Sequence, residues 1–497
     1  MSTLQAKEKL NRGEILKLFT CGFKPKAEHK IGMEFERLPI SVVTNNTVSY
    51  DGDFGVCNLL RAYAKSENWD YITDDYNIIG LKQGHDTITL EPGSQLELSI
   101  KPKNTIHDLK SKVDELNSQM KPILDKFNIK LLEYGVSPLS THKNILLIPK
   151  RRYRIMAQYL WGILSDVMMR ETAGIQCCID FENEEDAMRK FLIANKLVPF
   201  MTAMFANSPI RGGVETGYKS FRALSWLNTD NDRCGFCGEM IEDFSFDKYI
   251  DEVLKCPMIF INREDTPIAL RGKFSFEEFM KNGYRDFDAD IEDFKLHANL
   301  YFPEVRMRNF IEIRNQDCVG KDMIYSVLAI YKGILYNSSA MDEVEELLSE
   351  FCYNDFSELR YNVPKSALNA KIKRTSVLDI AKELLYIAEK SLIEMDTNEE
   401  VFLDPIKELI EDGICPADIL IKNWNGIWNK DITKLVKYLS SWRKKAIFWN
   451  RLITRFTLCK CSERKSFTIL PSWFERIEQF YFCHVFLHCT KRVLRSG

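Results

Sequence analysis

The strongest constraint on this chain is a short segment, residues 32–37, in which two glutamates are separated by one phenylalanine. In a β-strand, residues i and i+2 point to the same face, so Glu34 and Glu36 would stand side by side. Two adjacent carboxylates repel each other unless a cation or a proton lies between them. The segment therefore predicts a strand with one apolar face and one acidic face that needs a positive partner.

Two further segments repeat this alternation. In residues 87–100, Glu91, Gln95 and Glu97 share one parity, and leucines occupy the other. The segment 305–314 alternates in the same way, with mostly apolar odd positions. Its charged even positions are Arg306, Arg308, Glu312 and Arg314. Oxygen ligands in such numbers suit Mg²⁺, and neighbouring arginines suit phosphate. The alternative is that all three segments are solvated faces of an antiparallel sheet.

The order of the expected elements favours an α+β fold. Strands are expected mainly before residue 315, whereas the chain turns helical after it. The expected late helices cover residues 321–337, 341–351, 375–394 and 404–411. No repeat and no low-complexity linker occurs before residue 440. The sequence therefore predicts one catalytic domain over residues 1–440, with strands early and helices late.

The last segment, residues 441–497, differs from the rest. From Trp442 onward it holds 12 basic residues against 3 acidic ones, and it is rich in Phe, Trp and Cys. Its cysteines and histidines match no standard zinc-finger spacing. We predict that it is a separate basic appendage of unknown role, and that catalysis does not need it.

Charge and composition limit the partners and the compartment. A net charge of -3 gives no general case for binding nucleic acid or an anionic membrane. No apolar run approaches the roughly 20 residues of a membrane-spanning helix. The first eight residues lack an apolar signal core and include an acidic residue, which is atypical of a transit peptide. The expected location is therefore the cytoplasm, where the scattered cysteines would be reduced thiols.

Three smaller motifs have ordinary alternatives. Residues 212–220 nearly match a phosphate-binding loop, but Tyr218 breaks the spacing, so a flexible substrate loop fits better. Cys234 and Cys237 form a single CxxC pair without further metal ligands nearby, which favours a plain loop. The basic run at 150–154 is either a solvated helix start or a site for a carboxylate or a phosphate, and both remain open.

Several sequence blocks together resemble the plant-type glutamate–cysteine ligases, a family shared by plants and many bacteria. The resemblance runs in order from about residue 12 to about residue 440. The blocks are 32–36, 90–99, 149–156, 205–209, 220–226, 229–233 and 302–314. Two departures stand out. The family usually has glycine at the position of Arg151, and Gly-Ala at the position of Asn315-Gln316.

The resemblance implies a fold similar to the catalytic domain of glutamine synthetase, with a curved antiparallel sheet backed by helices and a helical C-terminal part. It implies ATP-dependent joining of L-glutamate to L-cysteine through a γ-glutamyl phosphate, the first step of glutathione biosynthesis. Two or more Mg²⁺ ions and ATP as co-substrate come with that reaction. The expected partners are these small molecules, without nucleic acid or membrane, and the expected state is a monomer or a homodimer.

The same resemblance, with strand position, suggests roles for the charged residues. The expected magnesium ligands are Glu34, Glu36, Glu91, Glu97 and Glu312, with Gln176 a lesser candidate. Glu312 and Arg314 are expected to form a catalytic pair, with Arg314 at the transferring phosphoryl group. The candidates for substrate carboxylates or phosphates are Arg152, Arg222 and Arg233. Two alternatives remain: a related ligase that joins glutamate to another amine, and a binding protein with an inactive ligase core.

Overall fold

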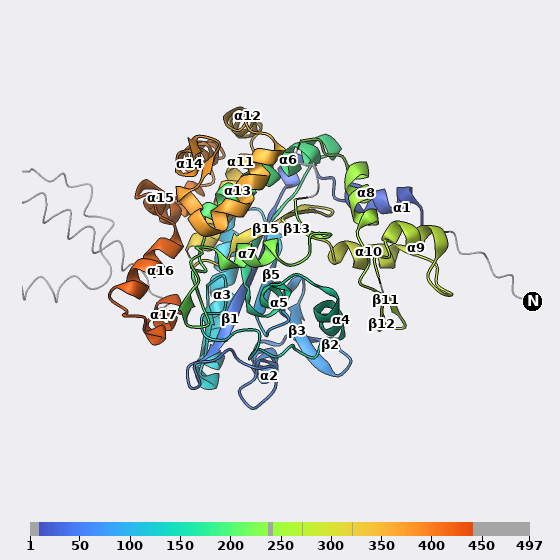
Figure 1. The fold of residues 1–497 in the computed structure, drawn as a ribbon, viewed down its shortest axis with the longest axis horizontal. Coiled ribbons are helices and arrows are strands. Elements are labelled where there is room, and N and C mark those ends of the chain that lie inside the picture. Colours follow the sequence, from blue (N-terminus) through green and yellow to red (C-terminus); the bar gives the residue numbers. More distant parts are fainter. Residues whose placement is uncertain (1–8, 237–241, 271, 321, 441–497) are drawn as a thin grey trace, which may run out of the picture. The chain divides into compact units, whose positions relative to one another are not determined.

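The computed structural model describes residues 9–236, 242–270, 272–320 and 322–440, shown as the coloured ribbon in Figure 1. The predicted appendage at 441–497 and Cys237 of the CxxC pair lie outside the described residues. Within the described part of the chain, every helix is too short or too polar to cross a membrane.

The fold is built on one nine-stranded sheet in which every neighbouring pair of strands is antiparallel. The strands lie in the order β14 (Val305–Met307), β15 (Ile311–Asp317), β7 (Gly174–Ile179), β1 (Ile31–Ser41), β5 (Leu96–Lys103), β4 (Asp86–Leu90), β3 (Asn77–Gln83) and β2 (Asp70–Asp74), and β6 (Ile129–Leu132) pairs with β1. The predicted α+β class with an antiparallel sheet is confirmed.

One face of this sheet is covered by helices. The N-terminal half packs α2 (Val56–Glu67) and α3 (Ile106–Phe127) beside the sheet, and the middle adds α6 (Glu184–Met204). The helical C-terminal part follows β15, as the sequence predicts. Its helices are α11 (Met323–Leu335), α12 (Ser338–Leu347), α13 (Tyr353–Ser366), α14 (Val377–Glu394), α15 (Asp404–Glu411), α16 (Pro416–Asn425) and α17 (Ile432–Leu439).

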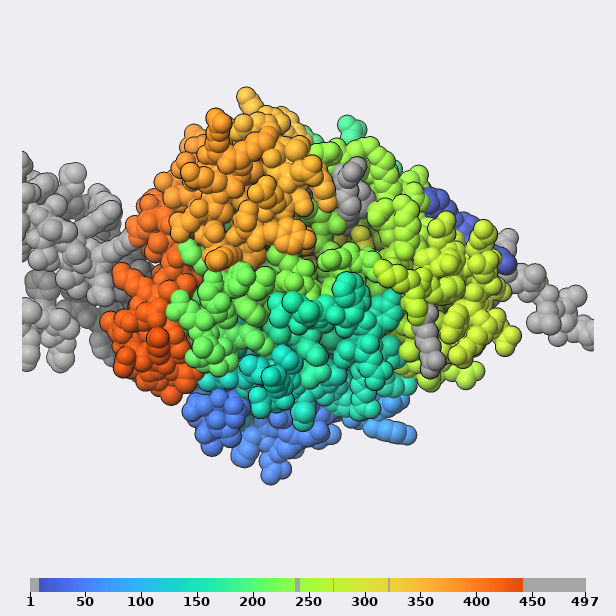
Figure 2. Space-filling model, viewed as in Figure 1, coloured from blue at the N-terminus to red at the C-terminus, as the bar shows by residue number. Residues whose placement is uncertain are grey.

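Shorter elements complete the described chain. The remaining helices are α1 (Arg12–Thr20), α4 (Arg151–Tyr159), α5 (Ser165–Glu171), α7 (Phe221–Leu227), α8 (Phe246–Lys255), α9 (Phe276–Asn282) and α10 (Ile291–Asn299). The two-stranded pairs are β8 (Ile210–Arg211) with β9 (Val214–Glu215), β10 (Cys234–Gly235) with β13 (Phe302–Pro303), β11 (Phe260–Arg263) with β12 (Thr266–Ala269), and β16 (Lys371–Ile372) with β17 (Thr375–Ser376). Figure 2 shows this part of the chain as a space-filling surface.

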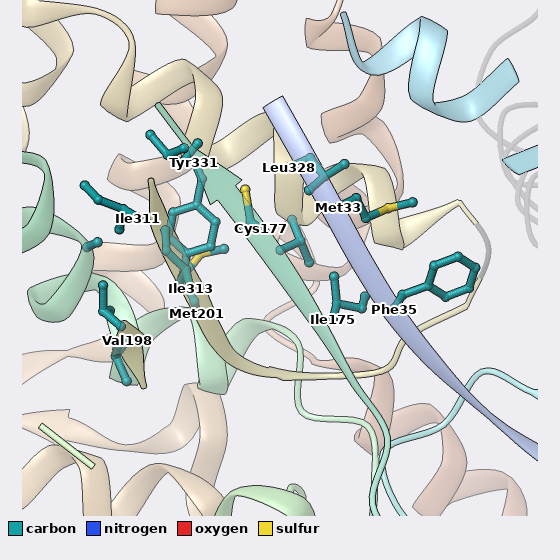
Figure 3. Packing of buried hydrophobic residues seen from close by; sticks show 14 of the residues in the cluster. Met33, Phe35, Ile175, Cys177, Val198, Met201, Ile311, Ile313, Leu328 and Tyr331 are labelled. Carbon is teal, nitrogen blue, oxygen red and sulfur yellow. The ribbon is translucent and has the colours of Figure 1, made fainter. Parts of the chain in front are cut away.

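The apolar parity of the central strands forms the core. Met33 and Phe35 of β1 are buried on the helix side, as are the odd-numbered residues of β7 and, in β15, Ile311 and Ile313. Figure 3 shows these side chains beside residues of α6 and α11, such as Met201 and Leu328. Because side chains alternate along a strand, the even-numbered residues of β1 and β7, among them Glu34, point to the other face of the sheet.

Two of the three segments expected to be single carboxylate strands each form a hairpin of two strands. The segment 87–100 forms β4 and β5 with a tight turn at 91–95, in which the Glu91 amide donates to the Gln95 carbonyl. Pro92 cannot donate to a sheet, and Ser94 has a φ of 73°, so the chain turns here. The segment 305–314 also turns, at 308–310, so Arg306 lies directly opposite Glu312 on the neighbouring strand.

Candidate active site

A cavity of about 290 Å³ lies on the sheet face that carries Glu34 and Glu36, opposite the apolar core. Strands β1, β5, β7, β14 and β15 supply its floor, and α4, α5 and α7 supply part of its walls. The glutamates that line it are Glu34, Glu36, Glu91, Glu97 and Glu312, and the arginines are Arg152, Arg306, Arg308 and Arg314. The structure thus brings all five expected magnesium ligands to one cavity, with Gln176 beside them.

Strand register explains why these carboxylates meet. Glu36 lies directly opposite Glu97 across β1 and β5, and Glu34 lies opposite Gln176 across β1 and β7. Directly opposed residues have closely spaced side chains, and like charges in that position destabilise a sheet. The sheet therefore holds the acidic residues together against their mutual repulsion.

Burial and this repulsion raise the pKa of three of the glutamates. The pKa of Glu34 rises to about 7, first because the side chain is buried and then because Glu312 is near. Burial and then Glu91 raise the pKa of Glu36 to about 7. Burial, followed by Glu34 and the other neighbouring carboxylates, raises the pKa of Glu97 well above its usual range.

Three of the cavity carboxylates, those of Glu36, Glu97 and Glu91, accept hydrogen bonds from neutral donors. Glu36 accepts from the amide of Gly174 at 2.6 Å, and Glu97 accepts from the hydroxyl of Thr89 at 2.9 Å. Glu91 accepts from the hydroxyl of Tyr153 at 3.2 Å. These donors orient the carboxylates and leave their negative charge to be balanced by protons or by a bound cation.

Glu312 has the opposite environment. Burial alone would raise its pKa, but Arg306, Arg314 and Arg308 together lower the pKa to about 2. One of its oxygens accepts from Nε of Arg306 and lies 3.4 Å from Arg314. Its other oxygen, Oε1, is buried and accepts no hydrogen bond from the described residues. Glu312 is therefore a permanent anion within an arginine cluster.

Arg314 stands at a β-bulge. Ile313 pairs with Cys177 of β7, but Gln316 pairs with Ile175, so two residues of β15 lie opposite one residue of β7. A bulge of this kind redirects side chains and is common next to active sites. Nη1 of Arg314 donates to Oε1 of Gln176 at 2.7 Å. Arg314 also lines the cavity, so the other donors of its planar guanidinium are available there.

The other three expected arginines have different positions. Arg152 lines the cavity from α4 and lies over the ring of Tyr153. Arg222 is buried beneath the bulge and donates to the carbonyls of Arg314 and Asn315, at 3.0 and 3.1 Å. Arg233 does not reach the cavity. Its buried guanidinium is bonded to Asp230 and to two backbone carbonyls, so its contacts are structural.

Several cavity residues have no individual role in the sequence prediction. Arg306 and Arg308 share the parity of Glu312, which identifies them as neighbouring arginines, and both line the cavity. Tyr153, the donor to Glu91, lies inside the basic run at 150–154, whose sequence fits either a solvated helix start or an anion site. The sequence prediction includes no apolar wall; in the structure it consists of Met156, Met168, Met169, Trp226, Leu300 and Phe302.

The donor set consists of carboxylate oxygens, which fit a hard cation such as Mg²⁺. Among the described residues, no three His, Cys, Asp or Glu side chains are grouped closely enough to enclose an ion as they stand. Nevertheless, five carboxylates share one cavity, and two of their pKa values are raised to about 7. A buried oxygen of Glu312 accepts no hydrogen bond from the described residues, although Arg308 lies 3.6 Å from it. Oxygen ligands of this kind suit Mg²⁺, which also keeps several waters and phosphate oxygens as ligands.

An antiparallel sheet with acidic and basic side chains gathered in one cavity on its face is the arrangement of an enzyme that binds charged substrates. The family model for glutamate-cysteine ligase family 2 matches residues 30–438. The chain therefore belongs to glutamate-cysteine ligase family 2 and is a ligase.

Individual relatives agree with the family match. The chain is 31% identical over 442 residues to glutamate–cysteine ligase B, chloroplastic, of Oryza sativa subsp. japonica, covering 88% of each chain. It is 32% identical over 440 residues to glutamate–cysteine ligase, chloroplastic, of Nicotiana tabacum, covering 87% of this chain and 84% of the relative. The relative from Arabidopsis thaliana is 31% identical, with the same coverage.

A solved structure shows the same fold. The glutamate–cysteine ligase of Francisella tularensis, in complex with AMP, has a TM-score of 0.52 and 15% sequence identity with this chain. The match covers 88% of this chain and 95% of the other. At this identity the likeness concerns the fold alone.

The expected cytoplasmic location is wrong. The curated relatives from Oryza sativa, Nicotiana tabacum and Arabidopsis thaliana are all named chloroplastic, not cytoplasmic. The expectation rested on the composition of the first eight residues, and so short a stretch is a weak guide to a targeting segment.

Proposed function

We propose that this chain joins the γ-carboxylate of L-glutamate to the amine of L-cysteine, with ATP as co-substrate and Mg²⁺ as cofactor. The observation that carries the proposal is the convergence of five glutamates and four arginines on one cavity. A carboxylate is a poor electrophile until it is phosphorylated, and phosphorylation brings one anion to another. That step needs concentrated positive charge placed before the reaction begins.

The arginines supply this charge from three directions. Arg314 comes from β15, Arg306 and Arg308 come from β14 and the turn after it, and Arg152 comes from α4. A planar guanidinium presents several donors in a fixed fork, which suits phosphate and carboxylate oxygens. We assign Arg314 to the transferring phosphoryl group, and Arg152 to a substrate carboxylate or phosphate.

The glutamates would hold the metal. Glu34, Glu36, Glu91, Glu97 and Glu312 are the proposed ligands, and they are positioned by β1, β5, β15 and the turn at 91–95. Bound Mg²⁺ would neutralise the phosphates of ATP and orient them. The apolar wall of methionines and aromatic residues, with Trp226 among them, would exclude water from the acyl phosphate while the amine attacks.

The direct test is to mix the protein with ATP, Mg²⁺, glutamate and cysteine, and to measure ADP release and the mass of the product. With all four components we expect ADP and γ-glutamylcysteine in equal amounts, and neither product when glutamate or Mg²⁺ is omitted. When only cysteine is omitted, we expect no γ-glutamylcysteine and no sustained turnover of ADP, because the acyl phosphate has no amine to react with. The absence of ADP from a folded, Mg²⁺-supplied protein would favour the inactive-core alternative and overturn the proposal.

A screen of amines tests the second substrate. Small apolar differences change discrimination by only about 1–3 kcal/mol, so 2-aminobutyrate should react more slowly than cysteine but measurably. We expect cysteine to have the highest kcat/KM. A higher kcat/KM with another amine would show that the chain is a ligase for that amine.

Mg²⁺ binding should depend on pH. The raised pKa values mean that the folded, metal-free protein holds protons on Glu34 and Glu36 that the unfolded chain loses nearer pH 4.5. The stability from these two groups is therefore complete below about pH 4.5 and is lost as the pH rises through about 7. Mg²⁺ replaces those protons, so its apparent affinity should rise at least about tenfold from pH 6 to pH 8.

Calorimetry in two buffers of different ionisation enthalpy measures both the affinity and the protons released. The Glu34→Gln variant should release fewer protons. The control Asp70→Asn, an exposed carboxylate of β2, should behave like the wild type. An affinity that does not change between pH 6 and pH 8 would place the metal away from this cluster.

A further inference from the structure

Helix α4 begins without a carboxylate of its own. Its N-cap residue, Lys150, makes no side-chain capping bond, and its first turn holds no acidic residue. Instead, the cations Lys150, Arg151 and Arg152 follow one another at this end. Cations are unfavourable at the N-terminus of a helix, because the helix dipole is positive there. The start of α4 therefore depends on negative charge from elsewhere in the fold.

Asp74, at the end of β2, supplies that charge. Its Oδ2 accepts from the backbone amide of Arg151 at 2.7 Å, and so satisfies one of the first amides of the helix, which have no partner within the helix. Its Oδ1 accepts from Nε of Arg151 at 2.8 Å and lies 2.7 Å from Nη2. The Asp74 side chain is only 14% exposed. Asp75 adds a weaker contact, 3.3 Å from Nη1 of Arg151.

The hairpin of β2 and β3 also contacts the residues just before the helix. The side-chain amide of Asn77 donates to the carbonyl of Pro149 at 3.4 Å, and the amide of Ile148 donates to the carbonyl of Pro92 at 3.0 Å. In Figure 1 the β2–β3 hairpin lies beside α4. The start of α4 is thus held between this hairpin and the turn that carries Glu91.

The next two residues of α4 point the other way, into the cavity. Arg152 and Tyr153 both line it, and the Tyr153 hydroxyl donates to Glu91. Neither Asp74 nor Arg151 is among the cavity-lining residues. Successive residues are about 100° apart around a helix, so a rotation of the first turn would move Arg152 directly.

We propose that Asp74 and Arg151 are positioning residues that fix the first turn of α4 and thereby the place of the Arg152 guanidinium in the cavity. The pair acts through Arg152 and touches no substrate itself. The kinetic consequence rests on the proposed function, because it requires that Arg152 meets a substrate. The structural consequence does not.

The kinetic test compares Asp74→Ala, Arg152→Ala and the double variant. We expect Asp74→Ala to lower kcat/KM about 3- to 30-fold, the range of a lost N-cap interaction, with most of the change in KM. The double variant should be no worse than Arg152→Ala alone, because Asp74 acts through Arg152. The control Asp70→Ala removes an exposed carboxylate from the other end of β2 and should stay within about twofold of the wild type.

The structural test needs no substrate. Hydrogen exchange of peptides covering residues 150–158 should be at least about threefold faster in Asp74→Ala than in Asp70→Ala, since the cap is lost. The isosteric Asp74→Asn variant, which keeps one acceptor oxygen, should lie between the two. This measurement also decides the proposal if Asp74→Ala is too unstable for kinetics.

Two results would overturn the proposal. One is unchanged exchange at 150–158 in both Asp74 variants. The other is a double variant whose loss is the product of the two single losses, because Asp74 would then act independently of Arg152. A wild type that is inactive with glutamate, cysteine, ATP and Mg²⁺ would instead refute the proposed function, and the exchange measurement would still judge the positioning pair.

Discussion

The Arg314→Lys variant is expected to lose about 100- to 1,000-fold in kcat, the usual cost of removing one donor that stabilises charge in the transition state. Lysine keeps the charge but not the planar fork. In the native protein, Nη1 of Arg314 donates to Gln176 and also lies 3.4 Å from Glu312. The remaining donors of the guanidinium are available to a phosphoryl oxygen. A single ammonium cannot satisfy these directions together.

Steady-state kinetics at saturating ATP and Mg²⁺ measure this loss. Arg263→Lys is a suitable control, because Arg263 pairs with Asp293 and does not line the cavity. It should keep kcat within about twofold of the wild type. A near-normal kcat for Arg314→Lys would show that this face of β15 is structural, and the assignment of the catalytic pair would be withdrawn.

The Glu312→Gln variant is expected to lose both turnover and stability. Glu312 is the counter-ion of Arg306 and lies near Arg308 and Arg314, so a neutral glutamine leaves a cluster of buried positive charge. Removing one partner of a buried ion pair typically costs about 3–5 kcal/mol. Turnover should fall by about 100-fold or more, because the arginines and the proposed metal lose a shared anion.

Glu97→Gln is the matched comparison. Burial and neighbouring carboxylates raise the pKa of Glu97 well above its usual range, whereas the arginines lower the pKa of Glu312. Without metal, Glu97→Gln should therefore reduce the free energy of unfolding less than Glu312→Gln does, and its main effect should be on the stabilisation by Mg²⁺. Urea unfolding with and without Mg²⁺ separates the two variants. Equal losses of metal-free stability would contradict the different charge states assigned here.

Much of the site could be predicted because a strand has a fixed period of two. Once residues 32–37 form a strand, Glu34 and Glu36 must share a face, whatever surrounds them. The same rule placed Glu97 and Glu312. The fold class followed from the order of strands and helices, together with the family resemblance. These predictions depend on local geometry, which neighbouring residues in the sequence specify.

The strand predictions based on local alternation failed where a turn or a bulge interrupted that period. The turn at 91–95 detached Glu91 from the strand that carries Glu97, although Pro92 and Gly93 signalled it. The turn at 308–310 made Arg306 a cross-strand partner of Glu312. The bulge at Arg314 depends on pairing with β7, which lies far away in the sequence.

The sequence by itself determined which residues could share a face of the sheet, and with the family resemblance it indicated the reaction. Only the tertiary structure decided the charge of each group. Glu34 and Glu312 are the same residue type, yet one has a pKa near 7 and the other near 2, because only Glu312 is closely surrounded by arginines. Arg152 and Arg233 both lie in family-like blocks, yet only Arg152 reaches the cavity. Burial and long-range neighbours set these differences, and both arise only when distant segments pack together.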